Sequence, residues 1–230
     1  MKLLIIIPAY NESENIERVV DDLIQNYPQY DYVIINDGSK DDTAKICREK
    51  HYNLIDLPIN LGLSGAFQTG VKYGYMNGYD AVLQYDGDGQ HQAMYIKKMV
   101  DAMKDNNADI VIGSRFVEKK KPNSLRMVGA RILKYTIKFT SGQAVSDPTS
   151  GMRLISKTVM GEFANQMNYG PEPDTIAYLI RNGAKVVEVQ VEMLERIAGE
   201  SYLNLKNSIL YMSRMLVSII LFQGFRKRGR

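Results

Sequence analysis

The first half of the chain alternates short runs of apolar, mostly β-branched residues with stretches whose apolar residues recur at helical spacing. The apolar runs predict strands at residues 3–7, 32–36, 53–57, 81–85 and 109–113. Between them, the spacing predicts helices at residues 13–25, 41–50, 63–75 and 94–105. Strands that alternate with helices are typical of βαβ units, so the pattern predicts an α/β fold with a mainly parallel central sheet flanked by helices.

The second half is less regular. Residues 125–139 predict a basic helix, a helix pair is expected around residues 171–174, and residues 185–191 predict a further strand.

Residues 203–225 predict a C-terminal amphipathic helix. Its uninterrupted apolar part, residues 215–222, is far shorter than the roughly 20 residues that span a bilayer. One helical face collects Leu205, Ile209, Met212, Leu216, Ile219 and Ile220. We expect one globular domain, residues 1–202, followed by this helix and a basic tail, residues 203–230. The helix is expected to lie in a membrane interface or to pack on the domain, and both interpretations are open.

Charge sharpens the interpretation of the tail. The chain has a net charge of +3, but four positive charges come from Arg226, Lys227, Arg228 and Arg230, so the remainder is slightly negative. A basic face for nucleic acid is therefore not expected. A basic cluster beside an apolar run favours an anionic membrane surface or a small membrane-protein partner, with a solubilising tail as the alternative.

The single cysteine and the N-terminal residues indicate the cellular compartment of the protein. Cys47 has no second cysteine with which to form a disulfide or a thiolate zinc site, which fits a reducing environment. The apolar run at residues 3–7 is too short for a signal peptide. We expect a cytoplasmic protein, peripheral on the inner face of the cell membrane. The oligomeric state is open, and a homo-oligomer is one option.

The most informative motif is the acidic run at residues 86–91, directly after a predicted strand. If the backbone stays extended, Asp86, Asp88 and Gln90 point to the same side. Oxygen ligands suit Mg²⁺ or Mn²⁺, which take their remaining ligands from water and substrate phosphates. The run therefore predicts a metal site for a diphosphate substrate, whereas an acidic surface turn is the alternative.

Other polar residues follow the ends of predicted strands, where ligands bind in open α/β sheets. Asp37 is placed to accept a hydrogen bond from a base or a ribose, or to cap a helix. Gly62 lies in a glycine-bearing helix entry that suits a phosphate. The first strand-to-helix turn, residues 8–12, lacks G-x-G-x-x-G, which argues against a dehydrogenase. A structural role is expected for His91.

Two further groups have competing interpretations. Arg196 and Ser201 form a donor set that could clamp a diphosphate, although an ordinary loop arginine is the default. Glu172 and Asp174 are an acidic pair that could supply a general base. Because prolines stand beside both, helix capping is an equal alternative.

Seven motifs in order from residue 5 to about 201 make the chain resemble the family 2 glycosyltransferases. They are Ile6-Ile7-Pro8-Ala9-Tyr10-Asn11-Glu12, Asn36-Asp37-Gly38-Ser39, Asn60-Leu61-Gly62, Asp86-Gly87-Asp88-Gly89-Gln90-His91, Gly113-Ser114-Arg115-Phe116, Thr149-Ser150-Gly151-Met152-Arg153 and Arg196-x-x-Gly199-x-Ser201. Within that family, the chain is most similar to the dolichol-phosphate-mannose synthase type, which includes bacterial polyprenyl-phosphate glycosyltransferases.

The resemblance implies a GT-A fold, a nucleotide-sugar donor and a divalent metal. It implies that the nucleoside is held by Pro8, Tyr10, Glu12 and Asp37. It places the metal on Asp86, Asp88 and Gln90, the donor diphosphate at Arg196 and Ser201, and the acceptor phosphate at Arg115 and Arg126. One departure is Tyr202, where family members often have lysine.

The expected activity is inverting, metal-dependent transfer of one sugar to a polyprenyl phosphate such as undecaprenyl phosphate. The expected donor is a UDP-sugar rather than a guanine nucleotide sugar. A phosphate acceptor already carries about −1.5 to −2 charges and needs no strong base. One alternative is transfer to a glycan or lipid hydroxyl with Asp174 or Glu172 as the base. A second is a non-catalytic, membrane-recruited nucleotide-binding subunit.

Overall fold

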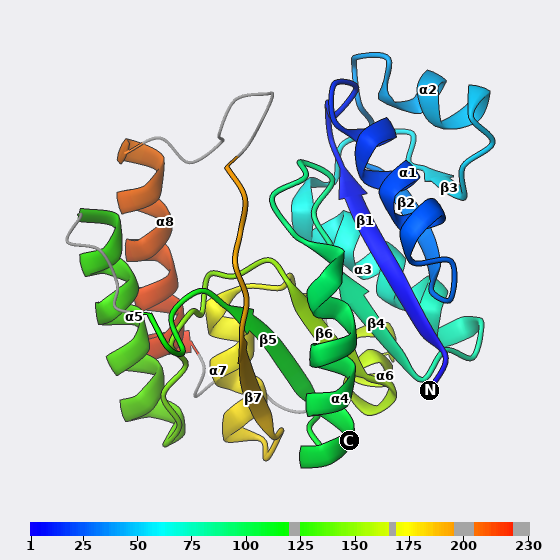
Figure 1. Ribbon diagram of the computed structural model, residues 1–230. Helices are drawn as coiled ribbons and strands as arrows, with labels where there is room; N and C mark the ends of the chain where they lie inside the picture. The colour runs from blue at the N-terminus through cyan, green and yellow to red at the C-terminus, as the bar shows by residue number, and fades with distance from the viewer. Residues whose placement is uncertain (120–124, 166–168, 196–204, 223–230) are drawn as a thin grey trace.

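The computed structural model describes residues 1–119, 125–165, 169–195 and 205–222, and in them a seven-stranded sheet lies between two layers of helices (Figure 1). The strands are β1 (Leu3–Ala9), β2 (Asp31–Asn36), β3 (Leu54–Asp56), β4 (Ala81–Gln84), β5 (Ile110–Ser114), β6 (Arg153–Ser156) and β7 (Val186–Gln190). Their order across the sheet is β3-β2-β1-β4-β6-β5-β7, and every neighbouring pair is parallel except those that include β6. The predicted α/β fold with a mainly parallel sheet is confirmed.

The helices divide between the two faces of the sheet. They are α1 (Ile16–Asn26), α2 (Thr43–Glu49), α3 (Gly62–Met76), η1 (Ala93–Tyr95), α4 (Ile96–Asn106), α5 (Leu125–Ser141), α6 (Lys157–Asn165), α7 (Pro173–Arg181), α8 (Leu205–Val217) and η2 (Ser218–Phe222). Buried residues of α1, α2 and α4 form the core on one face. Those of α3, α5, α6, α7 and α8 form the core on the other.

Strand β1 shows why these segments read as unbroken apolar runs. Leu4 and Ile6 belong to one core, while Leu3, Ile5 and Ile7 belong to the other. Successive side chains of a strand point to opposite faces, so a strand covered on both sides is apolar at every position. The central position of β1 in the sheet follows from this pattern.

Strand β6 is an element that the apolar pattern did not predict. It has four residues, and it inserts antiparallel between β4 and β5, with Gln84 opposite Arg153. A run this short, opened by an arginine, lacks the length that distinguishes a strand in sequence. Its position brings the segment before it, residues 147–152, next to the end of β4.

The chain order places a topological switch point between β1 and β4. From β1 the chain moves outward through β2 and β3, and then returns to place β4 on the other side of β1. Loops after β1 and β4 therefore leave the sheet in opposite directions, the arrangement at which open α/β sheets bind ligands. Of the predicted residues, Tyr10 and Glu12 lie in the loop after β1, and Asp86, Asp88 and Gln90 lie in the loop after β4.

The C-terminal helix packs on the domain. Met215 and Ile219 are buried in the same core as the sheet, and Met212 and Leu216 pack against that core. Much of the apolar face expected to meet a membrane is therefore turned inward, because the flank of α5 and α7 is available to cover it. No described helix is long and apolar enough to cross a bilayer.

Candidate active site

The loops after β1 and β2 are tied to each other by side-chain caps. The Asn11 N–H donates to Ser39 Oγ at 2.9 Å, and the Lys40 N–H donates to Asn11 Oδ1 at 2.8 Å. Glu12 is fixed in the same way, because its N–H donates to Thr43 Oγ1 at 2.9 Å. These bonds join the loop that carries Tyr10 and Glu12, two of the residues predicted to contact the nucleoside, to the loop after β2. Tyr10 is 42% exposed and faces solvent.

Asp37 is almost fully buried and joins β2 to the start of α3. Its Oδ1 accepts the Leu61 N–H at 2.7 Å, and its main-chain oxygen accepts Asn60 Nδ2 at 3.1 Å. Gly38 is required here, since a Cβ at φ +64° would lie 2.6 Å from the Asn60 nitrogen. Asp37 does not cap α2, because Asp42 holds that position. It fixes the helix entry at Gly62, on the side predicted for the nucleoside.

The acidic run follows β4 at the switch point, but its backbone turns at Gly87 and Asp88 and does not stay extended. The expectation that strand alternation orients the three ligands is therefore wrong. A bond from the Gln90 N–H to Asp88 Oδ1, at 3.0 Å, closes the turn. Asp86 Oδ1 accepts Gln84 Nε2 at 3.1 Å, so each carboxylate is oriented by a neighbouring amide.

His91 holds the start of this turn in place. Its Nδ1 accepts the Asp86 N–H at 2.9 Å, which leaves the proton of the neutral ring on Nε2, 3.6 Å from Asp86 Oδ2. The Tyr85 hydroxyl donates to the His91 carbonyl at 2.7 Å, and burial raises the pKa of that hydroxyl. The imidazole is buried and holds the Asp86 backbone in place, in agreement with a structural role.

The segment before β6 comes close to the Asp86 carboxylate. A Cβ at Gly151 would lie 2.4 Å from Asp86 Oδ2, so a glycine is needed for the segment before β6 to approach this carboxylate. The Gln90 Nε2 donates to the Leu194 carbonyl at 3.2 Å, so the amide oxygen of Gln90 is available as a metal ligand. No group of three or more His, Cys, Asp or Glu side chains in the described ranges could hold a metal alone. Two carboxylates and an amide fit a hard cation that shares its shell with water and phosphate.

Arg153 is a site residue to which the motifs assigned no role. It is fully buried and donates to the carbonyls of Ser150 at 2.8 Å, Pro148 at 2.7 Å and Pro171. Burial lowers the pKa of the guanidinium, and the nearby charges that oppose this shift include Glu172 and Asp86. Arg153 therefore joins the segment beside the acidic run to the loop that precedes α7.

Arg115 stands at the end of β5 in a two-bond ion pair with Asp147. Its Nε and Nη2 donate to the two carboxylate oxygens at 2.7 and 2.8 Å. Burial alone would lower the pKa of Arg115, and the Asp147 carboxylate outweighs it, so the pKa is raised. Asp147 is fully buried, whereas the Arg115 side chain is 25% exposed. Its predicted contact with an acceptor phosphate stays a prediction.

Glu172 and Asp174 lie at the start of α7 and meet α8. Glu172 occupies the N-cap position of α7, but its side chain makes no capping bond; its carboxylate accepts the Tyr211 hydroxyl. Asp174 is 5% exposed and accepts the Ser218 hydroxyl at 2.5 Å. Burial and the charge of Glu172 raise the pKa of Tyr211. Both carboxylates line a cavity of about 240 Å³ between α3, α7 and α8.

Three of the predicted residues cannot be placed. Arg196 and Ser201 lie outside the described residues. Arg126 belongs to the first turn of α5, and its side chain is outside the described part as well. Their roles remain predictions.

The chain was compared with known families and proteins. The model of Glycosyl transferase family 2 matches residues 4–163. An undecaprenyl-phosphate mannosyltransferase of Micrococcus luteus is 29% identical, over 87% of this chain and 87% of that protein. A UDP-N-acetylglucosamine–dolichyl-phosphate N-acetylglucosaminyltransferase of Methanococcus voltae is 30% identical, over 84% of this chain and 85% of that protein.

Solved structures agree in fold. Glucosyl-3-phosphoglycerate synthase from Mycobacterium tuberculosis, in complex with Mn²⁺, uridine diphosphate and phosphoglyceric acid, superposes with a TM-score of 0.67 at 18% identity, over 96% of this chain and 78% of that one. The mannosyltransferase PcManGT from Pyrobaculum calidifontis, in complex with GDP-Man and Mn²⁺, also gives 0.67, at 16% identity, over 100% of this chain and 66% of its own.

Proposed function

Because the chain belongs to glycosyl transferase family 2 and is a glycosyltransferase, we propose that it moves one sugar from a nucleotide sugar to the phosphate of a polyprenyl phosphate. The predicted GT-A fold is confirmed. The observation that carries the proposal is the meeting of two groups of predicted residues at the switch point between β1 and β4. There the acidic turn lies against the end of β1, since a Cβ at Gly87 would lie 3.3 Å from the Pro8 carbonyl oxygen, and β1 leads into the loop fixed by Asn11.

The donor side of the proposal rests on charge. Asp86, Asp88 and the Gln90 amide oxygen would hold Mg²⁺ or Mn²⁺, and the relatives' structures that contain Mn²⁺ with a nucleotide support this choice. When bound, such an ion neutralises the charge that develops on a leaving diphosphate. Pro8, Tyr10, Glu12 and Asp37 would hold the nucleoside. One of these relatives contains UDP and the other GDP-Man, so uracil remains only the expectation drawn from the sequence.

The acceptor side needs little proton chemistry. A phosphate monoester oxygen is already charged, so it forms the bond to the anomeric carbon directly. The bond from that carbon to the donor diphosphate breaks, and its electron pair leaves with the nucleoside diphosphate. A single displacement of this kind inverts the anomeric configuration. The chain's contribution is then positioning and electrostatic stabilisation, which supply much of the rate of such transfers.

The first prediction concerns the acceptor. Purified protein with Mn²⁺ is expected to transfer label from a nucleotide sugar to undecaprenyl phosphate and not to undecaprenol, because only the phosphate is ionised. UDP-glucose, UDP-N-acetylglucosamine and GDP-mannose are tested in parallel, and lipid extraction followed by mild acid hydrolysis identifies the linkage. Chelation by EDTA is expected to stop transfer. Label in undecaprenol, or in an acid-resistant product, would support the hydroxyl-acceptor alternative instead.

We further propose that the face formed by α5 and α8 rests on an anionic membrane. The two helices lie side by side at one edge of the molecule (Figure 1). The exposed apolar residues of these two helices and of η2, which follows α8, are called the apolar edge; they are Val128, Ile132, Tyr135, Phe139, Leu210, Val217, Ile220 and Leu221. Exposed apolar residues gathered on two adjacent helices indicate an interaction surface. A lipid-bound acceptor requires the enzyme to reach a bilayer, and the basic tail would add electrostatic attraction.

The second prediction tests the apolar edge. Phe139 is 92% exposed, and burying such a side chain contributes about 1.5–3 kcal/mol. Phe139→Ser is therefore expected to weaken binding to phosphatidylglycerol vesicles by roughly tenfold, as measured by cosedimentation. Met76→Ser is the matched control, because Met76 is 82% exposed at the end of α3. Equal losses in both variants, or unchanged binding in the Phe139 variant, would refute the assignment of this edge.

A further inference from the structure

One face of α8 completes the cavity at the start of α7. Tyr211, Arg214 and Ser218 are spaced by three and four residues, so they share one side of the helix. The Tyr211 hydroxyl donates to Glu172, and the hydroxyl of Ser218, the first residue of η2, donates to Asp174. The 240 Å³ cavity is lined by Tyr211, Arg214 and the two carboxylates, together with Ser64 at the start of α3 and Gly170. A segment expected to serve as an anchor therefore contributes to the polar interior next to the active site.

The cavity adjoins the predicted metal site through the buried Arg153. This guanidinium bonds the Pro171 carbonyl on one side and the Ser150 carbonyl on the other. Gly151, one residue after Ser150, touches the Asp86 carboxylate. A sugar whose diphosphate meets Asp86 would thus extend toward the cavity.

Arg214 is a cation that lines this cavity. Among the residues that the structure describes, its guanidinium has no hydrogen-bond or ion-pair partner. The two carboxylates beside it take hydroxyl donors instead, and the charge of Glu172 also acts on Arg153. Thr175 supplies a second unpaired polar group, because its buried hydroxyl lines the same cavity and has no hydrogen-bond partner among the described residues. Donors left open in a polar cavity point to a bound anion or hydroxyl.

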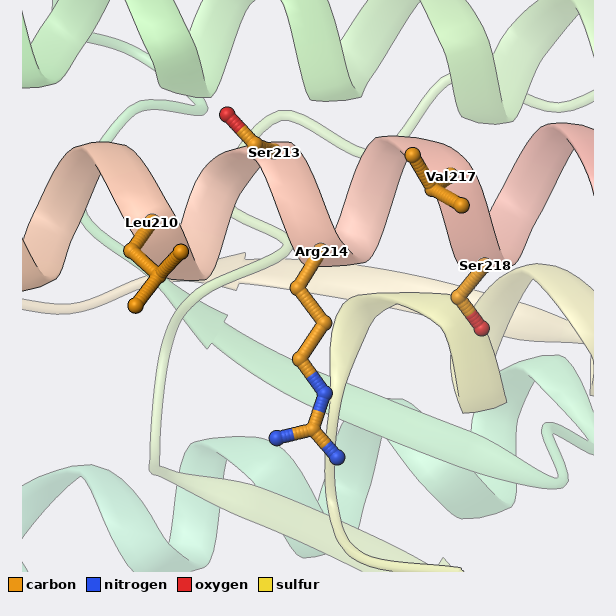
Figure 2. Close-up of a pocket in the computed structure, with 5 residues that line it drawn as sticks. All are labelled: Leu210, Ser213, Arg214, Val217 and Ser218. Atoms are coloured by element: carbon orange, nitrogen blue, oxygen red, sulfur yellow. The ribbon is translucent and has the colours of Figure 1, made fainter.

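Arg214 also lines a second, apolar hollow on the outer side of α8. This groove, of about 330 Å³, is formed with Leu210, Ser213, Val217 and Ser218. Figure 2 shows the Arg214 side chain extended away from the helix, with Leu210 one turn before it and Ser218 one turn after it on the same side. Leu210 and Val217 belong to the exposed apolar edge. The guanidinium therefore stands where an apolar groove meets a polar cavity.

We propose that Arg214 binds the phosphate of the polyprenyl phosphate acceptor, with the isoprenoid chain next to that phosphate lying in the groove of Leu210 and Val217. The inference rests on the proposed function. A guanidinium bonds phosphate oxygens in pairs, and an adjoining apolar surface suits a hydrocarbon chain. The donor diphosphate is the other phosphate in the reaction, but its nucleoside offers nothing apolar to the groove, and its metal would sit at Asp86 and Asp88.

The test compares Arg214→Gln and Arg214→Lys in the full chain. For the glutamine variant, the KM for undecaprenyl phosphate at saturating donor is expected to rise roughly tenfold to a hundredfold, because a charged hydrogen bond is lost. The lysine variant keeps the charge and is expected to rise less. The KM for the nucleotide sugar should change by no more than about twofold in either. Arg181→Gln, at the exposed end of α7, is the matched control.

A binding measurement separates the lipid phosphate from other sources of phosphate and does not depend on turnover. Farnesyl phosphate, farnesol and inorganic phosphate are titrated into the wild type and the glutamine variant. The wild type is expected to prefer farnesyl phosphate over both, and the variant to lose its preference over farnesol. An unchanged preference, or equal rises in both KM values, would overturn the role of Arg214. A wild type that makes no undecaprenyl product but keeps this preference would refute the proposed function alone.

Discussion

Replacing Asp88 with asparagine is expected to lower the rate of sugar transfer by about a thousandfold while the fold is retained. Asp88 is 6% exposed, and its Oδ1 closes the turn by accepting the Gln90 N–H. An asparagine has the same shape and keeps an oxygen for that bond, so the backbone should hold. It lacks the negative charge that a hard cation requires, so the affinity for Mn²⁺ should fall with the rate.

Three measurements on the Asp88→Asn variant define the outcome. Initial rates are recorded over a series of Mn²⁺ concentrations, nucleotide binding is titrated with and without Mn²⁺, and thermal unfolding checks stability. Asp101→Asn is the control, because Asp101 forms an exposed ion pair with Lys97 on α4 whose loss costs little. Turnover of the Asp88 variant within a few-fold of the wild type would falsify the assignment of Asp88 to the metal.

Much of the fold could be predicted from periodicity. The strands of the first half were found because both faces of the sheet are covered, which makes β1, β2 and β4 apolar throughout. The helices between them show their buried faces as 3.6-residue spacing, as in α1 with Val19, Val20 and Leu23. The pattern could not show β6, because four residues are too few for a period, and their pairing depends on residues far along the chain.

The site was predictable where function dictates residue types, and less so where packing places them. Asp86 and Asp88 could be singled out because two carboxylates and an amide follow a strand end, where ligands bind in open α/β sheets, although an acidic surface turn was the alternative. Their orientation could not be predicted, since a turn closed by the Gln90 N–H replaces the extended backbone. Arg153 was part of a recognised motif, but its role could not be predicted, because its partners are carbonyl groups, which leave no trace in the residue types. The proposed role of Arg214 could not be predicted either, because an arginine that interrupts an apolar segment usually indicates a charge exposed to solvent.

Replacing Asp147 with alanine is expected to destabilise the protein by about 3–5 kcal/mol, because it strands a mostly buried guanidinium. Asp147 is fully buried and accepts two bonds from the Arg115 side chain and one from its N–H at 3.1 Å. For a chain of this length the loss corresponds to roughly 10 °C in melting temperature. Thermal and urea unfolding measure it, and Asp101→Ala serves as the exposed control.

The double variant Arg115→Met/Asp147→Leu divides stability from function. Exchanging a buried ion pair for apolar residues of similar volume is often neutral, so the double variant should regain most of the lost stability. If Arg115 receives the acceptor phosphate, as the family resemblance implies, the KM for undecaprenyl phosphate should stay raised in this stable protein. Recovery of both stability and KM would limit Arg115 to its ion pair. Acceptor binding at this site would then depend on other cations, of which Arg214 is the one that the cavity geometry supplies.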